Sequence, residues 1–292
     1  MTISAGRFRH FAAIDWSGAV GERHRGIAVA LCAPGTEAPA LVRPGHRWSR
    51  VEVLGWLIDD LPQDTLVGMD LGLSLALADR GAFFPGWTES PADARSLWGP
   101  VDRLCAPDPH LAVAGFVDHA EASRHYRRHG GRQGDLFDGG RGRFRVTERA
   151  QERMGCKPYS NFNLVGAAQV GKSSLTGMRL LHRLASRLPV WPIDPLPDRG
   201  SVLVEIYTTI AAMAAGRSAG RSKMRTVADL NTALATLGSQ ATSGAGAIDD
   251  HASDALLTAA WLRTAAHRPA LWAPAGMTPA IAQTEGWTFG VP

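Results

Sequence analysis

The chain has 292 residues, 45% of them hydrophobic, and a formal net charge of +4; it can bury a large core, but the charge bias is too small to indicate a polyanionic partner. Its three cysteines, Cys32, Cys105 and Cys156, lie far apart without a CxxC pair, which argues against a disulfide framework or a structural zinc site and favours a reducing cytoplasm. Because there is no apolar signal core and no run of about 20 apolar residues, we expect a cytoplasmic protein with no membrane partner.

The N-terminal part of the chain predicts three strands, a helix and a fourth strand. Residues 11–16, 26–32 and 41–48 are short strand-like runs separated by turn residues. Residues 51–61 place their apolar side chains on one side of a helix, and residues 66–71 follow as a strand. Three antiparallel strands, a helix and a strand beside the first form the order of a ribonuclease-H-like core.

This alternation breaks up between residues 79 and 197, which we interpret as an insertion on a core made of residues 1–78 and 198–292. A basic segment, residues 124–157, runs through the insertion. Its glycine-rich centre, residues 130–142, predicts a mobile loop.

After the insertion, the sequence predicts a fifth strand and two helices. The strand covers residues 202–207, and the helices cover residues 227–237 and 250–266, with a glycine-rich joint over residues 238–246. The sequence therefore predicts an α/β fold: a ribonuclease-H-like mixed β-sheet flanked by helices, with a large insertion between the fourth and fifth strands.

Three of the predicted strands each carry a single acid within an apolar run. These acids are Asp15, Asp70 and Glu205. Burying an unpaired carboxylate costs several kcal/mol, so three acids at equivalent places suggest a shared partner, most simply a metal ion held between neighbouring strands.

The last predicted helix adds Asp250, His251 and Asp254 to this candidate site. A spacing of three or four residues puts His251 and Asp254, or Asp250 and Asp254, on one helix face. Hard oxygen ligands from several elements suit Mg²⁺ or Mn²⁺, and two such ions about 4 Å apart can align a phosphodiester for attack by water. The alternative is that Asp250 only caps the helix and that Asp15 and Asp70 bond to loop amides.

Several short motifs resemble the bacterial family catalogued as domain of unknown function 429. The motifs that carry the resemblance are Ile14-Asp15, Gly68-Met69-Asp70, Leu164-Val165-Gly166 with Val170-Gly171 and Gly177-Met178, Val190-Trp191-Pro192-Ile193-Asp194, Val204-Glu205-Ile206-Tyr207, Asp249-Asp250-His251-Ala252-Ser253-Asp254-Ala255 and Glu285-Gly286-Trp287. The resemblance covers nearly the whole chain and implies a ribonuclease-H-like fold. The closing helix resembles that of RuvC-type Holliday-junction resolvases, which implies metal binding by His251 and Asp254, with Asp250 as second choice. Thr208 departs from the family pattern, which often has proline there.

Residues 166–173 match the phosphate-loop pattern letter for letter. In a working loop Gly166 and Gly171 would shape the backbone around a nucleotide, Lys172 would meet the phosphate charge and Ser173 would hold Mg²⁺. Such a loop needs a strand before it and a helix after it, which residues 161–165 and 175–188 would have to supply. A glycine-rich turn that packs near the acidic site is the favoured alternative.

The basic segment predicts either a nucleic-acid contact or an ordinary solvated loop. Arginine is the main source of phosphate contacts, and the candidates are Arg141, Arg143, Arg145 and Arg149. Aromatic residues interleaved with the segment could stack on bases; these are Phe137, Phe144 and Tyr159.

The preferred hypothesis is a nuclease or related phosphodiesterase that uses Mg²⁺ or Mn²⁺ and acts on nucleic acid. Asp15, Asp70 and Asp254 would be direct metal ligands, while Glu205 and His251 would be ligands or position the attacking water. Two alternatives remain: a nucleotide-hydrolysing protein that works through Lys172, and a non-catalytic ribonuclease-H-like module that binds a nucleic acid or protein partner.

Overall fold

The structure is a computed structural model that describes residues 6–166 and 170–292. Its centre is a six-stranded mixed sheet with the strand order β3-β2-β1-β4-β6-β5. The strands are β1 (His10–Asp15), β2 (Ala28–Cys32), β3 (Ala40–Leu41), β4 (Thr65–Met69), β5 (Val190–Trp191) and β6 (Val202–Glu205). Strand β1 is antiparallel to β2 and parallel to β4, and β4, β6 and β5 run parallel to one another. The predicted α/β class is therefore confirmed.

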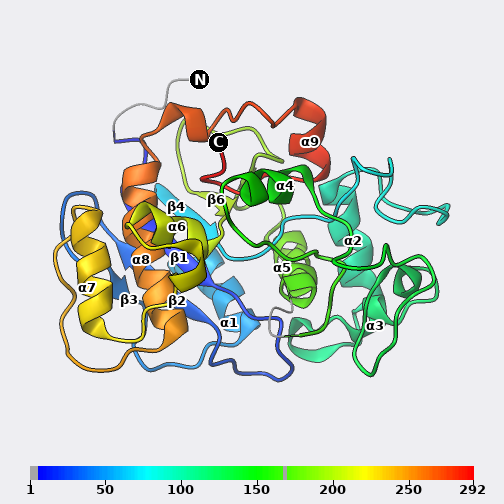
Figure 1. Cartoon of the computed structure of the whole chain (residues 1–292), viewed down its shortest axis with the longest axis horizontal. Coiled ribbons are helices and arrows are strands. Elements are labelled where there is room, and N and C mark those ends of the chain that lie inside the picture. Colours follow the sequence, from blue (N-terminus) through cyan, green and yellow to red (C-terminus); the bar gives the residue numbers. More distant parts are fainter. Residues whose placement is uncertain (1–5, 167–169) are drawn as a thin grey trace.

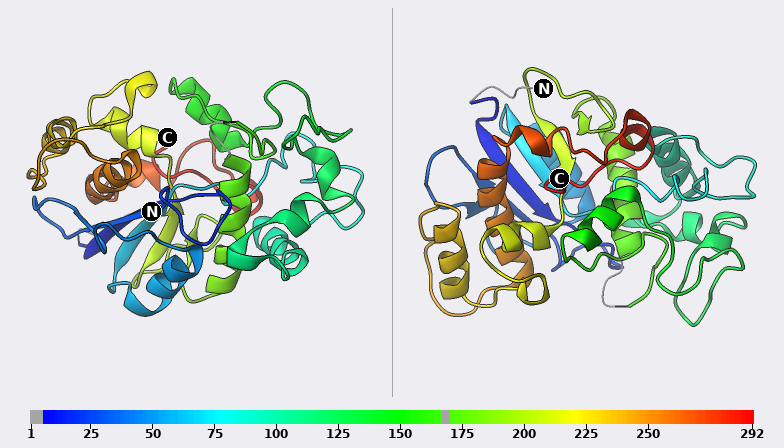
Figure 2. Two further views of the ribbon diagram at one scale, coloured as in Figure 1. Left: turned by 90° about the horizontal axis from the view of Figure 1, so that it is seen from below. Right: turned by 45° about the horizontal axis from the view of Figure 1, so that its top comes forward.

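Helices cover both faces of the sheet (Figure 1). The α-helices of the described residues are α1 (Arg50–Gly55), which continues as a π-helical turn (Trp56–Asp60), α2 (Ala94–Leu104), α3 (Ala114–Val117), α4 (Val146–Arg153), α5 (Val170–Leu184), α6 (Thr208–Ala214), α7 (Val227–Thr236), α8 (Asp250–Ala265) and α9 (Pro279–Thr284). Helix α8 packs on β1 and β2 and crosses the sheet face (Figure 2). Buried residues lie all along α8, as expected of a helix covered on most sides.

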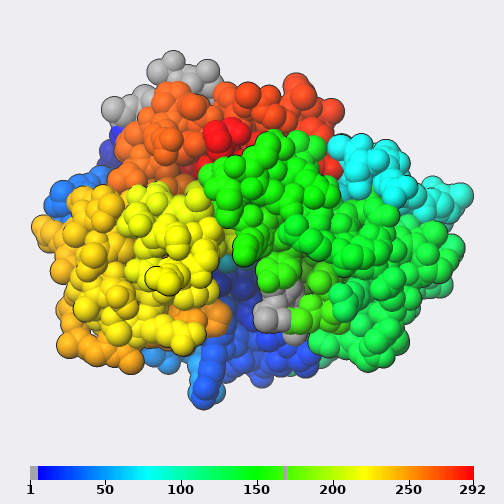
Figure 3. Space-filling model, in the orientation of Figure 1, coloured from blue at the N-terminus to red at the C-terminus, as the bar shows by residue number. Residues whose placement is uncertain are grey.

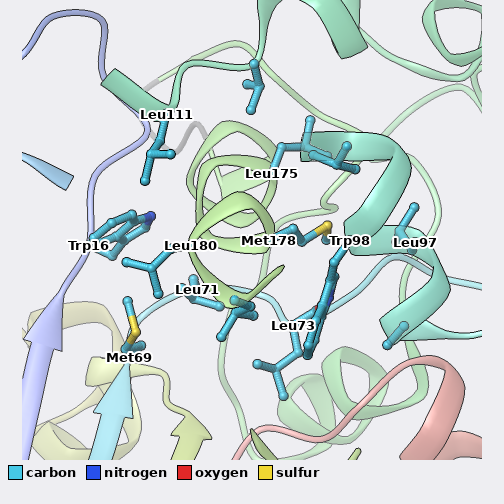
Figure 4. Packing of buried hydrophobic residues seen from close by; sticks show 14 of the residues in the cluster. Trp16, Met69, Leu71, Leu73, Leu97, Trp98, Leu111, Leu175, Met178 and Leu180 are labelled. Atoms are coloured by element: carbon cyan, nitrogen blue, oxygen red, sulfur yellow. The ribbon is translucent and has the colours of Figure 1, made fainter. Parts of the chain in front are cut away.

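Alternate residues of the central strands serve two hydrophobic clusters, one on each face. Ile14 and Met69 belong to the cluster beneath α1, α2 and α5, whereas Ala13 and Leu66 belong to the cluster beneath α6 and α8. In the first cluster, Met178 of α5 lies beside Trp98 of α2, with Met69 at the end of its strand nearby (Figure 4). The predicted insertion therefore shares a continuous core with the sheet.

Three predicted elements differ from the structure. Strand β3 has two residues, not the eight of the predicted run 41–48, because Arg43 and Gly45 adopt positive φ values of 55° and 77° and turn the chain away. Residues 161–165 form no strand and instead bond to the backbone of Arg127 through Phe162 and Leu164. The helix predicted from residue 175 to residue 188 spans Val170–Leu184, and Ala185, with φ of 50°, directly follows its end.

No helix in the described part of the chain combines the length and hydropathy that a bilayer span requires.

Candidate functional site

The parallel pairing of β1 and β4 brings two acids to the same edge of the sheet. Asp15 is the last residue of β1, and Asp70 directly follows β4. The amide of Asp70 donates to the carbonyl of Ile14 at 3.0 Å, so the two acids are neighbours across the strand pair. Because both strands end here, their polar residues leave the hydrophobic core together.

The first turns of α8 bring His251 and Asp254 to this edge. The Nδ1 atom of His251 lies 2.9 Å from Oδ2 of Asp15, while the Asp254 side chain is 5% exposed and contacts the ammonium group of Lys223. Asp250 turns elsewhere: its side chain is 37% exposed and lies 3.9 Å from Arg225. The structure thus brings together Asp15, Asp70, His251 and Asp254 and leaves Asp250 outside.

The electrostatics of this acidic site show that its negative charges affect one another. Burial holds the pKa of Asp70 well above its usual range, and the charges of Asp15 and Asp254 add to that effect. Burial also raises the pKa of Asp254 to about 6, although Lys223 works in the opposite direction. The hydrogen bond with Asp15 raises the pKa of His251. The acids form one electrostatic cluster that favours a cation.

A cavity of about 490 Å³ opens beside the acidic site. Asp70, Lys223 and His251 line it together with Tyr159 and Thr208. The space-filling view shows the molecule hollowed where the yellow segment around α6 and the green segment around α4 face the blue N-terminal part (Figure 3). The volume of the cavity lies within the range typical of small-ligand pockets.

Glu205 ends β6 near the same cavity, but other groups use its carboxylate. Arg145 donates to both of its oxygens, at 2.6 and 2.8 Å. The Leu73 amide donates to Oε2 at 2.8 Å, and the Thr288 hydroxyl donates to Oε1. With two donors on each oxygen, the Glu205 carboxylate is held as the acceptor of a buried network, and these bonds would compete with the catalytic role predicted for it.

Two of the four arginines predicted to bind nucleic acid, Arg143 and Arg145, are buried and engaged by partners within the chain. Arg143 pairs with Asp79 and donates to the carbonyl oxygens of Ala76, Ala82 and Phe83. Arg145 is 2% exposed and donates hydrogen bonds to the carboxylates of Glu205 and Glu148.

The other two arginines, Arg141 and Arg149, are exposed but share an ion-pair partner. Both bind Glu152, at 2.6 and 2.8 Å, and both lie over the ring of Phe144. Glu152 thus neutralises part of the positive charge that a phosphate would meet at either guanidinium group. Acids interspersed in the basic segment, such as Glu152, therefore orient its arginines; no role was predicted for these acids from the sequence.

The phosphate-loop-like segment borders the cavity. Residues 167–169 lie outside the described part of the chain, and Gly171, Lys172 and Ser173 belong to the first turn of α5. The Gly18 amide donates to the Ser173 hydroxyl at 3.1 Å, and the Trp16 indole donates to the Ser173 carbonyl at 3.1 Å. Burial lowers the pKa of Lys172. The first turn of α5 contacts the loop that follows β1, and residues 161–166, the described part of the chain just before it, form no strand.

The donors present suit a divalent ion in kind but are not arranged as a ligand set. Asp15, Asp70 and Asp254 supply hard oxygen atoms, and their mutual repulsion would be relieved by a cation. Within residues 6–166 and 170–292, however, no group of three such side chains converges closely enough to hold a metal ion. Lys223 already contacts one of the carboxylates.

Lys223 was not among the residues predicted from the sequence. It lies in a short basic run between α6 and α7, a pattern that by itself resembles a solvated loop. A signal for it was available in the balance of charge, because several acids that meet at one largely buried site require a positive charge from elsewhere in the chain. Comparisons of the chain with protein-family models, curated proteins and solved structures gave no match. Function must therefore be inferred from the geometry and charge of the site itself.

Proposed function

We propose that this chain is a divalent-metal-dependent nuclease, or a related phosphodiesterase, built on a ribonuclease-H-like core of the kind that the resemblance to domain of unknown function 429 implies. The strand order, with β1 antiparallel to β2 and parallel to β4, supports that core. We further propose a cytoplasmic location, which the three free, buried cysteines support.

The observation that carries the proposal is the meeting of Asp15, Asp70 and Asp254. They come from two strand ends and a helix; Asp70 lies on the wall of an open cavity, and the charge of Asp15 helps to raise the pKa of both Asp70 and Asp254. Such convergence of buried acids in a cavity is typical of a functional site. A fold alone does not indicate an activity. A cluster of carboxylates does, because its oxygen atoms suit a divalent ion.

In the proposed reaction, Asp15, Asp70 and Asp254 would hold Mg²⁺ or Mn²⁺, which when bound polarises a phosphoryl oxygen and lowers the pKa of water. His251 bonds to Asp15 through Nδ1. In the neutral ring that donates this bond, Nε2 is a proton acceptor, so His251 can take a proton from the attacking water. The hydrogen bond fixes the orientation of the ring.

Nucleic acid is the substrate class that best fits the cavity. Tyr159, whose side chain is half exposed, lies on the cavity wall and can stack on a base or sugar. Lys223 gives the same wall a positive charge that can meet a phosphate.

The test is cleavage of labelled single-stranded, hybrid and branched substrates by purified protein with Mn²⁺, Mg²⁺ or EDTA. We expect Asp70→Asn to reduce the rate by at least about 100-fold. Asp138→Asn, which replaces an exposed acid paired with Arg80, is the matched control and should keep the parental rate. Cleavage by Asp70→Asn as fast as by the parent would remove the proposal. Metal-dependent substrate binding without cleavage would favour the non-catalytic module.

A further inference from the structure

We infer that Lys223 is a tethered cation that occupies the acidic site in place of a divalent ion, so that a metal ion binds only after this ammonium group has moved away. The inference rests on the proposed function, because it assumes that Asp15, Asp70 and Asp254 are the metal ligands. It adds a residue that sets the metal affinity of the site.

The contacts of Lys223 place its charge where a metal ion would act. Its Nζ atom donates to Oδ2 of Asp254, and Asp15 and Asp70 both lie close enough to affect it electrostatically. An ammonium group is a compact point charge with three donors, so a single lysine can offset several carboxylates.

The ammonium group also engages one of the carboxylate oxygens that a ligand set would use. In the described residues no three metal-binding side chains converge, although three acids line one site. Asp254 directs one oxygen to Lys223, and Asp15 directs one oxygen to His251. Oδ2 of Asp254 is thus occupied by the ammonium group, whose positive charge opposes the approach of a second cation to the same carboxylate.

The side chain of Lys223 can leave without a movement of the backbone. It is 49% exposed, whereas that of Asp254 is 5% exposed, so the lysine reaches a fixed acid from the solvent side. The neighbouring residue Met224 is fully buried, and its carbonyl accepts a hydrogen bond from Ser253 at 2.9 Å. Arg217 donates to the carbonyl of Lys223 itself at 3.1 Å. The exchange is therefore a rotation of a flexible stem on an anchored backbone.

Because the lysine and the metal ion compete for one oxygen, removing the ammonium group should strengthen metal binding. We expect Lys223→Met, which keeps most of the stem, to bind Mn²⁺ at least about tenfold more tightly than the parent in a calorimetric titration without substrate. Lys223→Arg keeps a positive charge and should keep the weak parental affinity. Arg225→Met removes a nearby exposed cation that lies 3.9 Å from Asp250, and it should change the affinity little.

A second readout covers the case in which Lys223→Met is less stable. Without metal its three acids lack their lysine partner, so saturating Mn²⁺ should raise its melting temperature by more than it raises that of the parent. Equal or weaker Mn²⁺ binding by Lys223→Met, with binding by the parent that still depends on Asp70, would overturn the inference and leave the proposed function standing. If neither protein binds Mn²⁺ at millimolar concentration, the metal-dependent function and the inference both fail.

Discussion

Arg145 and Glu205, 60 residues apart in the chain, meet as a two-point ion pair in which each guanidinium Nη atom donates to a different carboxylate oxygen. Arg145 also pairs with Glu148 at 2.9 Å, and all three side chains are almost fully buried. The pair joins the start of α4 to the end of β6. A buried pair of this kind is costly to break, because the remaining carboxylate is left almost fully buried without its partner.

Arg145→Met should therefore lower the free energy of unfolding by about 3–5 kcal/mol, since it leaves Glu205 and Glu148 unpaired. Urea denaturation followed by circular dichroism measures this change. Arg149→Met, on the exposed side of α4, is the matched control and should change the stability by less than about 1 kcal/mol. The double variant Arg145→Met/Glu205→Gln should recover part of the loss. Equal effects of the two single arginine variants would show that the buried pair contributes no more than a surface one.

Acid should destabilise the protein through two buried histidines. The Nε2 atoms of His24 and His125 have no hydrogen-bond partner among the described residues. Burial lowers the pKa of each to about 4, and positive charge from Arg50 or Arg143 adds to the effect. Between pH 6.5 and 4 the unfolded chain takes up protons that the folded chain does not, so the free energy of unfolding falls as the pH falls through this window.

The variant His125→Phe isolates this contribution. It removes the titrating ring, keeps an aromatic side chain against Phe84, and should flatten the pH dependence of the urea midpoint between pH 6.5 and 4. Asp254, with a pKa raised to about 6, contributes in the opposite direction, so the informative quantity is the difference between variant and parent. His129→Gln, at an exposed position, is the control. An unchanged slope in His125→Phe would contradict the prediction.

Gly18 is needed where the loop after β1 docks on α5. A Cβ atom added there would collide with backbone atoms of Lys172 and Ser173, which cannot move without shifting the start of the helix. We expect Gly18→Ala to cost about 1–3 kcal/mol in thermal or urea unfolding. Gly220→Ala is the control, because no atom lies within 4 Å of its added Cβ. A parental melting temperature for Gly18→Ala would show that this contact is loose in solution.

The three cysteines should be unreactive in the native protein. All three are buried and free, and burial raises the pKa of Cys32 to about 11 and that of Cys105 to about 12. Because the thiolate is the reactive form, a coloured disulfide reagent should modify them slowly at neutral pH. In denaturant the same reagent should titrate all three at once. Fast modification of any thiol in the native state would indicate local opening around it.

The sheet could be predicted from the sequence where a strand is buried on both sides. Strands β1, β4 and β6 appear as apolar runs with one acid, and α8 is marked by an N-terminal Asp249 that caps it through a bond from the amide of His251 at 3.0 Å. Such patterns lie within a few consecutive residues, so they can be recognised without knowledge of the fold. The predicted length of β3 was wrong because the strand-like pattern of the sequence continues beyond Leu41, whereas the backbone turns away from the sheet at Arg43.

The partners of the charged residues could not be predicted in the same way. Nothing in the local sequence distinguishes buried Arg145 from exposed Arg149, because the difference lies in whether Glu205 or Glu152 is nearby in space. The same holds for Lys223, whose partner Asp254 lies 31 residues away. Acids within apolar runs are conspicuous in a sequence, whereas the long, flexible cations that neutralise them can come from any loop.

The pairing of β6 with residues near the end of the chain affects the order in which the fold can form. The amide of Phe289 donates to the carbonyl of Glu205 at 2.8 Å, and the Thr288 hydroxyl, 83 residues from Glu205, donates to its carboxylate. During synthesis, β6 therefore emerges well before the segment that completes it. Until that segment arrives, one side of the hydrophobic cluster beneath α8 lacks Trp287 and Phe289 and is exposed to water and to chaperones.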